Sequence, residues 1–281
     1  MLGEGWLSTA RNEYNLSMDA AERWMVFARS DADFAHARIY FSRRQGLRWE
    51  TPVELQLSSL RYKDSDPWLT PDGRTLYFIS DRPLHGDEPN GSLDIWRVSF
   101  DDGHIGVPEH LDVVASPKSE MGPELHDGWL YFNSSRPGGP AKVSLYRAKQ
   151  MGDGFGPPEP LGAPFNAGED QGDFTLSADG RRAVFWQAPP GASDSDLVVV
   201  CRLKDGWSSA IRLPAPINAV GMEFTPSFSA DGKWLRFAAQ RPAVKGAPPN
   251  TIDNGEANFF EVSTSVLDTA LHNSADGKAC D

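Results

Sequence analysis

Hydrophobic and polar positions alternate along this chain in short runs, and the same pattern returns about every 50 residues. Each copy opens with an acidic or amide residue, continues through an apolar run and a turn, and closes a second apolar run at Phe. The five copies are 13–27 (EYNLSMDAAERWMVF), 64–78 (DSDPWLTPDGRTLYF), 120–132 (EMGPELHDGWLYF), 171–185 (QGDFTLSADGRRAVF) and 223–237 (EFTPSFSADGKWLRF). Repetition at this period predicts a single closed array of similar units rather than unrelated domains.

Each unit contains four short segments of strand character, and none has a convincing helical period. Asp-Gly pairs at 72–73, 127–128, 179–180 and 231–232 predict tight hairpins between the first and second strands. Third strands are expected at 38–40, 94–96, 144–146, 196–198 and 258–260, and fourth strands at 49–55, 107–111, 155–161 and 207–213. Most fourth strands carry Pro, which lacks a backbone donor and is tolerated on sheet edges, so they are the outermost. The expected fold is therefore all-β: a five-bladed β-propeller of four-stranded antiparallel blades.

The last blade lacks a fourth strand after its third, and the N-terminus offers a match. Residues 5–10 (GWLSTA) resemble residues 206–210 (GWSSA). We therefore expect residues 5–10 to supply the outer strand of the last blade and to close the ring, which removes an exposed sheet edge. The propeller is expected to span residues 1–270, followed by a disordered tail at 271–281. Expected blade boundaries are 11–58, 59–114, 115–164, 165–216 and 217–270.

Composition narrows the class of partner. The formal net charge is −12, from 27 basic and 39 acidic residues, which argues against a nucleic-acid-binding surface. No apolar run approaches the roughly 18 residues of a membrane span, and no secretory signal is visible at the start of the chain. Cys201 falls in an expected core strand and Cys280 in the tail, so we expect two free thiols rather than a disulfide.

With these residues laid out, the units resemble PD40 (WD40-like, TolB-type) propeller repeats. The resemblance is carried by TPDGRTLYF at 70–78, SDRP at 80–83, DIW at 94–96, and SADG at 177–180 and 229–232. It covers the chain to residue 270. The resemblance implies a bacterial protein, commonly exported to the periplasm, that serves as a binding scaffold for proteins or small ligands. A cytoplasmic location remains the alternative.

One acidic or amide residue opens every first strand: Glu13, Asp64, Glu120, Gln171 and Glu223. Because the first and second strands are antiparallel, the start of one lies beside the end of the other. This predicts pairs of Asp64 with Arg82, Glu120 with Arg136, and Glu223 with Arg241. In blade one Asp31 stands where the Arg would be, so Glu13 is expected to lack its repeat partner.

Two interpretations of this ring stay open. Each acid can accept a charge-assisted hydrogen bond from its Arg and lock blade to blade. Alternatively, the eight residues just named, the five ring residues and the three Arg, line the mouth of the central channel and bind a cation or a small polar ligand. The missing partner of Glu13 is the best argument for the second interpretation.

Catalysis is the alternative from another class. Glycoside hydrolysis needs two acids roughly 5–10 Å apart, and a propeller channel can place them so. Glu124, His126 and Asp173 break the repeat, as do Trp68 and Trp186, although core packing is the simpler role for the tryptophans. An enzyme requires Glu124 or Asp173 to be open to the channel and free of Arg partners.

The sequence carries no motif for a cofactor or a metal. The six His show no ligand spacing, and no Gly-rich phosphate loop or nucleophile elbow is present. We therefore expect a non-catalytic binding or interaction scaffold with no cofactor, whose partner is a protein, a small polar ligand or an oligosaccharide at the channel mouth and loop face. A glycoside hydrolase or polysaccharide lyase with acids lining the channel is the alternative.

Overall fold

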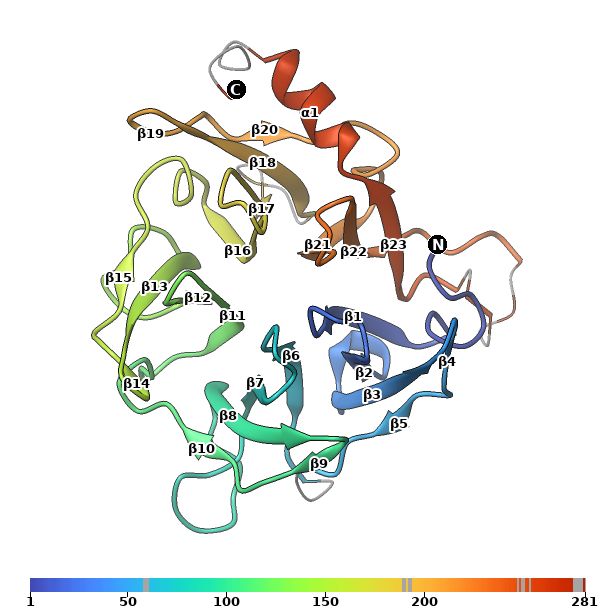
Figure 1. The fold of residues 1–281 in the computed structure, drawn as a ribbon, viewed down its shortest axis with the longest axis vertical. Coiled ribbons are helices and arrows are strands. Elements are labelled where there is room, and N and C mark those ends of the chain that lie inside the picture. Colours follow the sequence, from blue (N-terminus) through green and yellow to red (C-terminus); the bar gives the residue numbers. More distant parts are fainter. Residues whose placement is uncertain are drawn as a thin grey trace.

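The computed structural model confirms the all-β, five-bladed propeller (Figure 1). Five antiparallel sheets stand around a common axis, and the chain completes one sheet before it starts the next. The structure describes residues 1–57, 61–188, 191, 194–246, 248, 251–252, 254–274 and 280.

In every blade the innermost strand pairs with the second, and the second with the third. These strands are β1 (Asn12–Met18), β2 (Trp24–Ser30) and β3 (Arg38–Gln45); β6 (Asp64–Leu69), β7 (Thr75–Ser80) and β8 (Asp94–Asp101); β11 (Glu120–His126), β12 (Trp129–Ser134) and β13 (Ser144–Met151); β16 (Asp170–Leu176), β17 (Arg182–Ala188) and β18 (Asp196–Leu203); β21 (Met222–Phe228), β22 (Trp234–Gln240) and β23 (Ala257–Ser263). A short 3₁₀ turn, η1 (Ala32–Phe34), precedes β3.

Each expected outer strand of the first four blades is divided into two short strands that both pair with the third. They are β4 (Arg48–Trp49) and β5 (Val53–Glu54), β9 (His104–Ile105) and β10 (Glu109–His110), β14 (Gly154–Phe155) and β15 (Glu159–Pro160), and β19 (Gly206–Trp207) and β20 (Ile211–Arg212). Among the described residues the last sheet has three strands. The last blade therefore depends on another segment to cover the outer edge of β23.

The hydrophobic core lies between neighbouring blades. The Phe that closes each repeat is buried in a cluster that also contains side chains of the preceding blade; the five are Phe27, Phe78, Phe132, Phe185 and Phe237. Full burial of such a side chain contributes roughly 1.5–3 kcal/mol. The repeat thus reappears as one inter-blade anchor per unit, and Phe27 packs against Ala238 and Phe259 of the last blade.

The N-terminal segment covers the outer edge of β23, but not as the predicted strand. The backbone N–H of Leu2 donates to the carbonyl oxygen of Phe259 at 2.7 Å. The Ser8 hydroxyl accepts from the Phe259 N–H at 3.1 Å and donates to the Leu2 carbonyl at 2.8 Å. Leu7 is fully buried beneath this contact.

Blade four shows why the closure uses the backbone of Leu2 and the side chain of Ser8 instead of a strand at residues 5–10. There the Leu213 N–H donates to the Leu197 carbonyl, and the Asn218 side chain bridges both residues. Leu2 and Ser8 repeat these two roles in the last blade. The expectation of a strand at 5–10 was wrong because Gly5 was aligned with Gly206 in β19, which pairs with the far end of β18 rather than with Leu197.

The C-terminal segment forms a helix that the sequence analysis missed. Helix α1 (Ser265–His272) lies along the rim beside β18 and β20 (Figure 1), where Leu267 and Leu271 are buried. Its apolar residues at 266, 267, 270 and 271 have helical spacing, a signal that was available but short. Residues 271–274, expected to begin a disordered tail, instead finish α1 and its cap; residues 275–279 and 281 lie outside the described residues.

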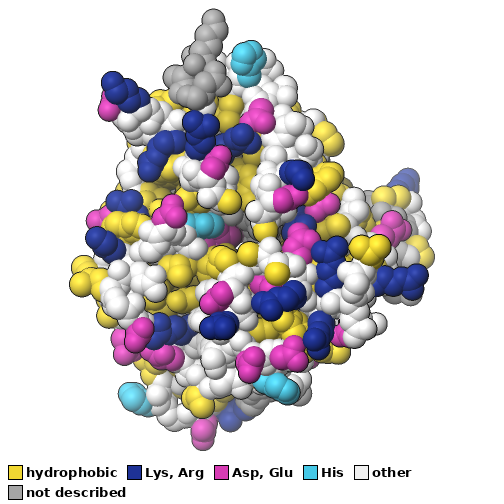
Figure 2. Space-filling model, viewed as in Figure 1, with side chains coloured by type: hydrophobic (Ala, Val, Ile, Leu, Met, Phe, Trp, Pro, Cys, Tyr) yellow, Lys and Arg dark blue, Asp and Glu magenta, His cyan; other side chains and the backbone are white. Residues whose placement is uncertain are grey.

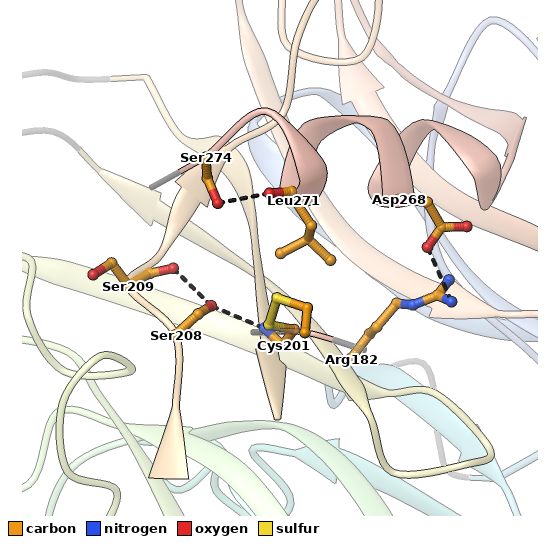
Figure 3. Close-up of a disulfide and its surroundings, with 8 residues drawn as sticks. Arg182, Cys201, Ser208, Ser209, Asp268, Leu271 and Ser274 are labelled. Atoms are coloured by element: carbon orange, nitrogen blue, oxygen red, sulfur yellow. Dashed lines mark hydrogen bonds and ion pairs between the residues drawn. A yellow bond between two sulfur atoms is a disulfide. The ribbon is translucent and has the colours of Figure 1, made fainter. Parts of the chain in front are cut away.

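A disulfide joins Cys201 of β18 to Cys280 (Figure 3), so the expectation of two free thiols was wrong. The two Cα atoms are 5.6 Å apart, within the range that a disulfide requires. Arg182 adds an ion pair to Asp268 of α1 at 3.0 Å. The two cysteines are 79 residues apart in the sequence, and this spacing did not indicate that they pair. They meet because α1 packs against blade four, which contains Cys201.

Candidate functional site

Two rings of residues lie on the innermost strands of the five blades. The first ring is the set of acidic and amide residues that the sequence analysis predicted. This outer ring consists of Glu13, Asp64, Glu120, Gln171 and Glu223, all between 0 and 2% exposed. Three of the acids accept the backbone N–H of the residue four positions earlier: Glu13 from Thr9, Glu120 from Ser116, and Glu223 from Ala219. Each of these three acids therefore connects the linker that enters its blade to the first strand of that blade.

The three predicted acid–Arg pairs are confirmed. Asp64 pairs with Arg82 at 2.7 Å, Glu120 with Arg136 at 3.3 Å, and Glu223 with Arg241. The expectation that Glu13 lacks a partner was wrong. Arg29, which stands directly opposite Glu13 in the β1–β2 ladder, donates its Nε–H at 2.8 Å. The sequence comparison missed Arg29 because it lies two positions earlier than the Arg of the other blades.

Each of these Arg side chains also lies over aromatic rings of its own blade. The guanidinium of Arg29 is 4.7 Å from the ring centroid of Tyr40, that of Arg82 4.9 Å from Phe78, and that of Arg136 4.8 Å from Tyr146. A cation held between a carboxylate and an aromatic face is a structural contact. The ligand-binding role of the outer ring stays a prediction, and these contacts fit the blade-locking alternative better.

Burial governs the charge of two ring members. Burial raises the pKa of Glu13 despite the bonds from Thr9 and Arg29 that oppose the shift. Burial raises the pKa of Glu223 to about 7, although Arg241 counteracts it. Gln171 takes the same place in blade four without any charge and donates its Nε2–H to the Val143 carbonyl at 2.5 Å. A neutral amide therefore serves where no Arg is present.

The second ring lies two residues further along each first strand. This inner ring consists of Asn15, Asp66, Gly122, Asp173 and Thr225, all with φ between +48° and +60°. In every blade the strand ladder shifts register at this point, so the inner ring forms five β-bulges. Pro follows in three blades, at 67, 123 and 226, and cannot donate to the ladder. A bulge re-aims its side chain, here toward the axis of the propeller.

Hydrogen bonds link the inner ring from blade to blade. The Asn15 N–H donates to the Thr225 hydroxyl at 3.1 Å, and the Thr225 N–H donates to Asp173 at 3.2 Å. The Gly122 N–H donates to Asp66 at 3.1 Å. Gly122 has no side chain to continue the pattern, and the Asn133 amide oxygen accepts the Asp173 N–H at 3.3 Å instead. These bonds between neighbouring blades form a hydrogen-bonded belt along part of the inner ring.

A cavity of about 370 Å³, here called the mouth cavity, opens on the side of the inner ring where the first strands begin. Every blade contributes to its wall. Its aromatic residues are Tyr14, Phe34, Trp186 and Phe224, and its charged residues are Lys63, Asp66, Asp170, Asp173 and Asp194. Among the described residues, the outer ring contributes none of the lining.

Two half-buried carboxyls of the inner ring, Asp66 and Asp173, face the mouth cavity. Burial and then the charge of Asp66 raise the pKa of Asp173 to about 7, while bonds from the Thr225 N–H and the Trp186 side chain oppose the shift. Burial also raises the pKa of Asp66, which accepts the Ser65 hydroxyl and has Lys63 nearby. The site therefore resists a second negative charge.

The channel continues past the inner ring to the opposite mouth. Glu124 Oε2 and His126 Nε2 form a hydrogen bond at 2.7 Å, and burial raises the pKa of Glu124. Both residues line a cavity of about 330 Å³ there, together with Trp68. Glu124 and Asp173 face the channel, and no Arg pairs with either within the described part of the chain. The enzyme alternative required this arrangement, and a scaffold is compatible with it.

The sequence analysis singled out Asp173 of the inner ring and Trp186 of the mouth cavity. It missed the other four residues of the inner ring. The signal was present two residues after each ring acid, where the repeat reads Asn, Asp, Gly, Asp and Thr. Asn, Asp and Gly are the residues that tolerate positive φ most readily. Tyr14, Phe34 and Phe224 carry no such mark, because aromatic residues in a propeller are more often core.

The remaining surface offers fewer indications. Acidic and basic side chains are interspersed over the face drawn in Figure 2, with no single-sign patch. Across the described residues, no three His, Cys, Asp or Glu side chains converge as a metal site. No helix in that part of the chain is long and apolar enough to cross a membrane.

No family model matches the chain, and no curated protein matches it. Among solved structures it is similar to an α-L-arabinofuranosidase from Lactobacillus brevis (13% identity, TM-score 0.58, 92% of each chain covered). It is also similar to a putative TolB from Agrobacterium tumefaciens (13% identity, TM-score 0.52, 90% of this chain and 82% of that one). TolB from Acinetobacter baumannii matches at 15% identity and a TM-score of 0.49, over 90% of this chain and 54% of that one. At these identities the likeness shows the fold alone.

Proposed function

We propose that this chain is a non-catalytic binding scaffold that holds a small ligand, or a short segment of a partner protein, in the mouth cavity. The observation that carries the proposal is the cavity itself, whose wall combines apolar and aromatic side chains from all five blades with a few convergent polar groups. Such a lining is typical of ligand sites. Membership of the PD40 repeat family and a TolB-like role in protein binding are part of this proposal.

Hydrogen bonds hold both carboxyls of the mouth cavity in place. Asp66 accepts bonds from the Ser65 hydroxyl and the Gly122 N–H, and Asp173 accepts the Thr225 N–H and the Trp186 side chain. Polar groups fixed in this way can set the orientation of a bound ligand.

A thermal-shift experiment tests this proposal, because a ligand selective for the native state raises its stability. The panel holds oligosaccharides, amines, short peptides and divalent cations. Ala188→Trp fills the mouth cavity, and Ala230→Trp places the same ring at the opposite mouth. We expect at least one compound to raise Tm in the wild type and in Ala230→Trp but not in Ala188→Trp. A shift that survives Ala188→Trp, or none at all, would contradict the proposal.

Glycoside hydrolysis is the second candidate, and one observation favours it. Asp66 and Asp173 line the same cavity, and a carboxyl with a pKa of about 7 can donate a proton at neutral pH. The expected result for the scaffold is no turnover of aryl glycosides by the wild type. Turnover that is lost in both Asp66→Asn and Asp173→Asn would establish the enzyme instead.

We also propose that the protein works in an oxidising compartment outside the cytoplasm. The Cys201–Cys280 disulfide supports this, because such bonds persist mainly in exported proteins. Alkylation of the protein under denaturing conditions, straight after extraction from cells, followed by intact-mass measurement, tests it. Two alkylated cysteines would place the protein in a reducing compartment.

A further inference from the structure

The charge of the mouth cavity is one-sided. Four carboxyls line it, Asp66, Asp170, Asp173 and Asp194, and Lys63 is the one basic side chain among its described lining residues. Asp170 is partly neutralised by Lys142, whose Nζ lies 3.7 Å away. Asp66 and Asp173 both belong to the inner ring and line this cavity, and the charge of Asp66 disfavours a negative charge on Asp173. The carboxyls would repel an anionic ligand and attract a cation.

Aromatic side chains also line the cavity. Tyr14, Phe34 and Phe224 form a triangle of rings with centroids 5.3 to 6.1 Å apart in edge-on and tilted contacts. Tyr14 and Phe224 come from the two strands that meet at the ring closure, and Phe34 reaches them from η1. Aromatic faces attract cations that carry an apolar shell more readily than they attract hydrated metal ions.

We propose that the mouth cavity binds an organic ammonium ion, with the charged nitrogen on Asp66 and Asp173 and the apolar body against Tyr14, Phe34 and Phe224. This inference rests on the proposed function and names its ligand class. The ammonium can belong to a free amine or to the amino end or lysine of a peptide. The absence of a three-ligand metal cluster in the described part of the chain agrees with an organic rather than a metal cation.

Protonation of Asp173 gives this ligand class a signature that neutral ligands lack. The groups around Asp173 are the carboxyls of Asp66 and Glu124, the Thr225 N–H and the Trp186 side chain, and Lys63 stands beside Asp66. With a pKa of about 7, Asp173 is largely protonated at pH 6, and a bound cation must displace that proton. The affinity for an amine then falls by up to about tenfold for each pH unit below the pKa of Asp173, and it becomes constant above that pKa.

Calorimetric titration of the wild-type protein at pH 6, 7 and 8 tests the inference. The probes are phenethylamine, its neutral counterpart phenethyl alcohol, a neutral trisaccharide, and a short peptide with either a free or an acetylated amino terminus. We expect phenethylamine to bind and to tighten about tenfold from pH 6 to pH 8, whereas phenethyl alcohol shows no such gain. A free-terminus peptide that binds more tightly than both would identify the source as a partner protein.

Two variants and a control locate the effect. Asp173→Asn removes the titrating carboxyl and should weaken amine binding at least about tenfold at pH 8 while abolishing the pH dependence. Phe34→Ala removes the aromatic side chain that η1 contributes to the cavity. It should weaken amine binding without changing the pH dependence of that binding. Asp127→Asn, an exposed carboxyl at the opposite mouth, is the matched control and should bind as the wild type does.

The outcomes separate this inference from the proposed function. The trisaccharide or the alcohol could bind in a manner that Ala188→Trp blocks, while the amine binds no better. That result would support the proposed binding scaffold and contradict the inference that its ligand is an ammonium ion. If amine binding survives Asp173→Asn unchanged, the inference also falls. If no probe binds and the broader ligand panel gives no Ala188→Trp-sensitive shift, both proposals fall together.

Discussion

The outer and inner rings are two residues apart in every blade and yet behave differently. Residue type is nearly constant in the outer ring, where four buried acids each pair with an Arg and a Gln takes the fifth place. Backbone geometry is constant in the inner ring, but its residue types vary from Asn to Gly to Asp to Thr. A position that repeats its chemistry in every blade meets a need that every blade has. A position that repeats only its conformation is free to vary with a ligand.

The contrast extends to charge. Outer-ring acids lie beside Arg guanidinium groups, so a buried negative charge has its counter-ion. Asp173 in the inner ring has two other carboxyls near it and no Arg within the described part of the chain. Removing an outer-ring acid would leave a buried Arg without its counter-ion, whereas neutralising Asp173 removes a charge that burial and Asp66 disfavour. Substitutions in the two rings should therefore have opposite effects on stability.

The largest effect is expected when the N-terminal segment that supports Glu13 is removed. A chain beginning at Ala10 loses Leu7 from the core, the Leu2 and Ser8 contacts to Phe259, and both Thr9 bonds to Glu13. We expect the unfolding free energy to fall by on the order of 5 kcal/mol in urea denaturation. Full stability in the truncated chain would show that the ring closes without this segment.

The next effect is expected from an outer-ring acid in the middle of the chain. Asp64→Ala leaves Arg82 buried without its carboxylate and should lower the unfolding free energy by about 3 kcal/mol. Glu88→Ala is the matched control, because Glu88 pairs with Arg61 at the surface, where such pairs contribute about 0.5 kcal/mol or less. Equal losses in the two variants would mean that the outer ring does not lock the blades.

A substitution in the inner ring is expected to raise the free energy of unfolding at neutral and higher pH. The pKa of Asp173 is about 7 in the native state, above its ordinary value of 3.8. The native protein thus binds more protons than the unfolded chain between about pH 4 and pH 7, so stability falls as pH rises through that window. Asp173→Asn removes this loss of about 4 kcal/mol but weakens one accepted bond by about 1 kcal/mol. The net effect is a gain of about 3 kcal/mol at pH 8 and a loss of about 1 kcal/mol at pH 4.

Denaturant titrations of Asp173→Asn at pH 4, 6 and 8 measure this effect beside the wild type. Asp127→Asn, which changes an exposed turn carboxyl into an amide, controls for the substitution itself. The stability of the wild type should decline toward pH 8, and the decline should be shallower in Asp173→Asn. A variant that is less stable than the wild type at every pH would show that the charge of Asp173 is compensated in the native state.

The sequence alone predicted the architecture because each blade repeats the same local signals. Apolar alternation, Asp-Gly turns and the closing Phe each act within a few residues, and all five copies agree. The three acid–Arg pairs followed from strand antiparallelism in the same way. Contacts that cross the repeat were not predictable: the Cys201–Cys280 bond, the fold-back of α1, and the closure through Leu2 all depend on how the chain ends meet the finished ring.

The inner ring was overlooked for a related reason. Asn, Asp and Gly at these positions are compatible with positive φ. A bulge, however, is defined by the pairing of two strands, so residue types alone do not establish that all five positions share one backbone conformation. Arg29 was missed because an Arg two positions earlier in β2 can still reach Glu13 across the ladder. Side-chain reach and register are properties of the folded sheet, and repeat alignment captures them only where the spacing is unchanged.

The smallest expected effect concerns the hydrogen-bonded belt itself. Thr225→Val keeps the shape of the side chain but leaves the Asn15 N–H without its acceptor, whereas Thr225→Ser keeps the hydroxyl. We expect Thr225→Val to be about 1 kcal/mol less stable than Thr225→Ser. Hydrogen exchange of the Asn15 amide should also be faster in the Val variant. Equal stability and equal exchange would mean that the belt only follows from the bulges, and that the inner ring can change its residues for a ligand at no cost to the fold.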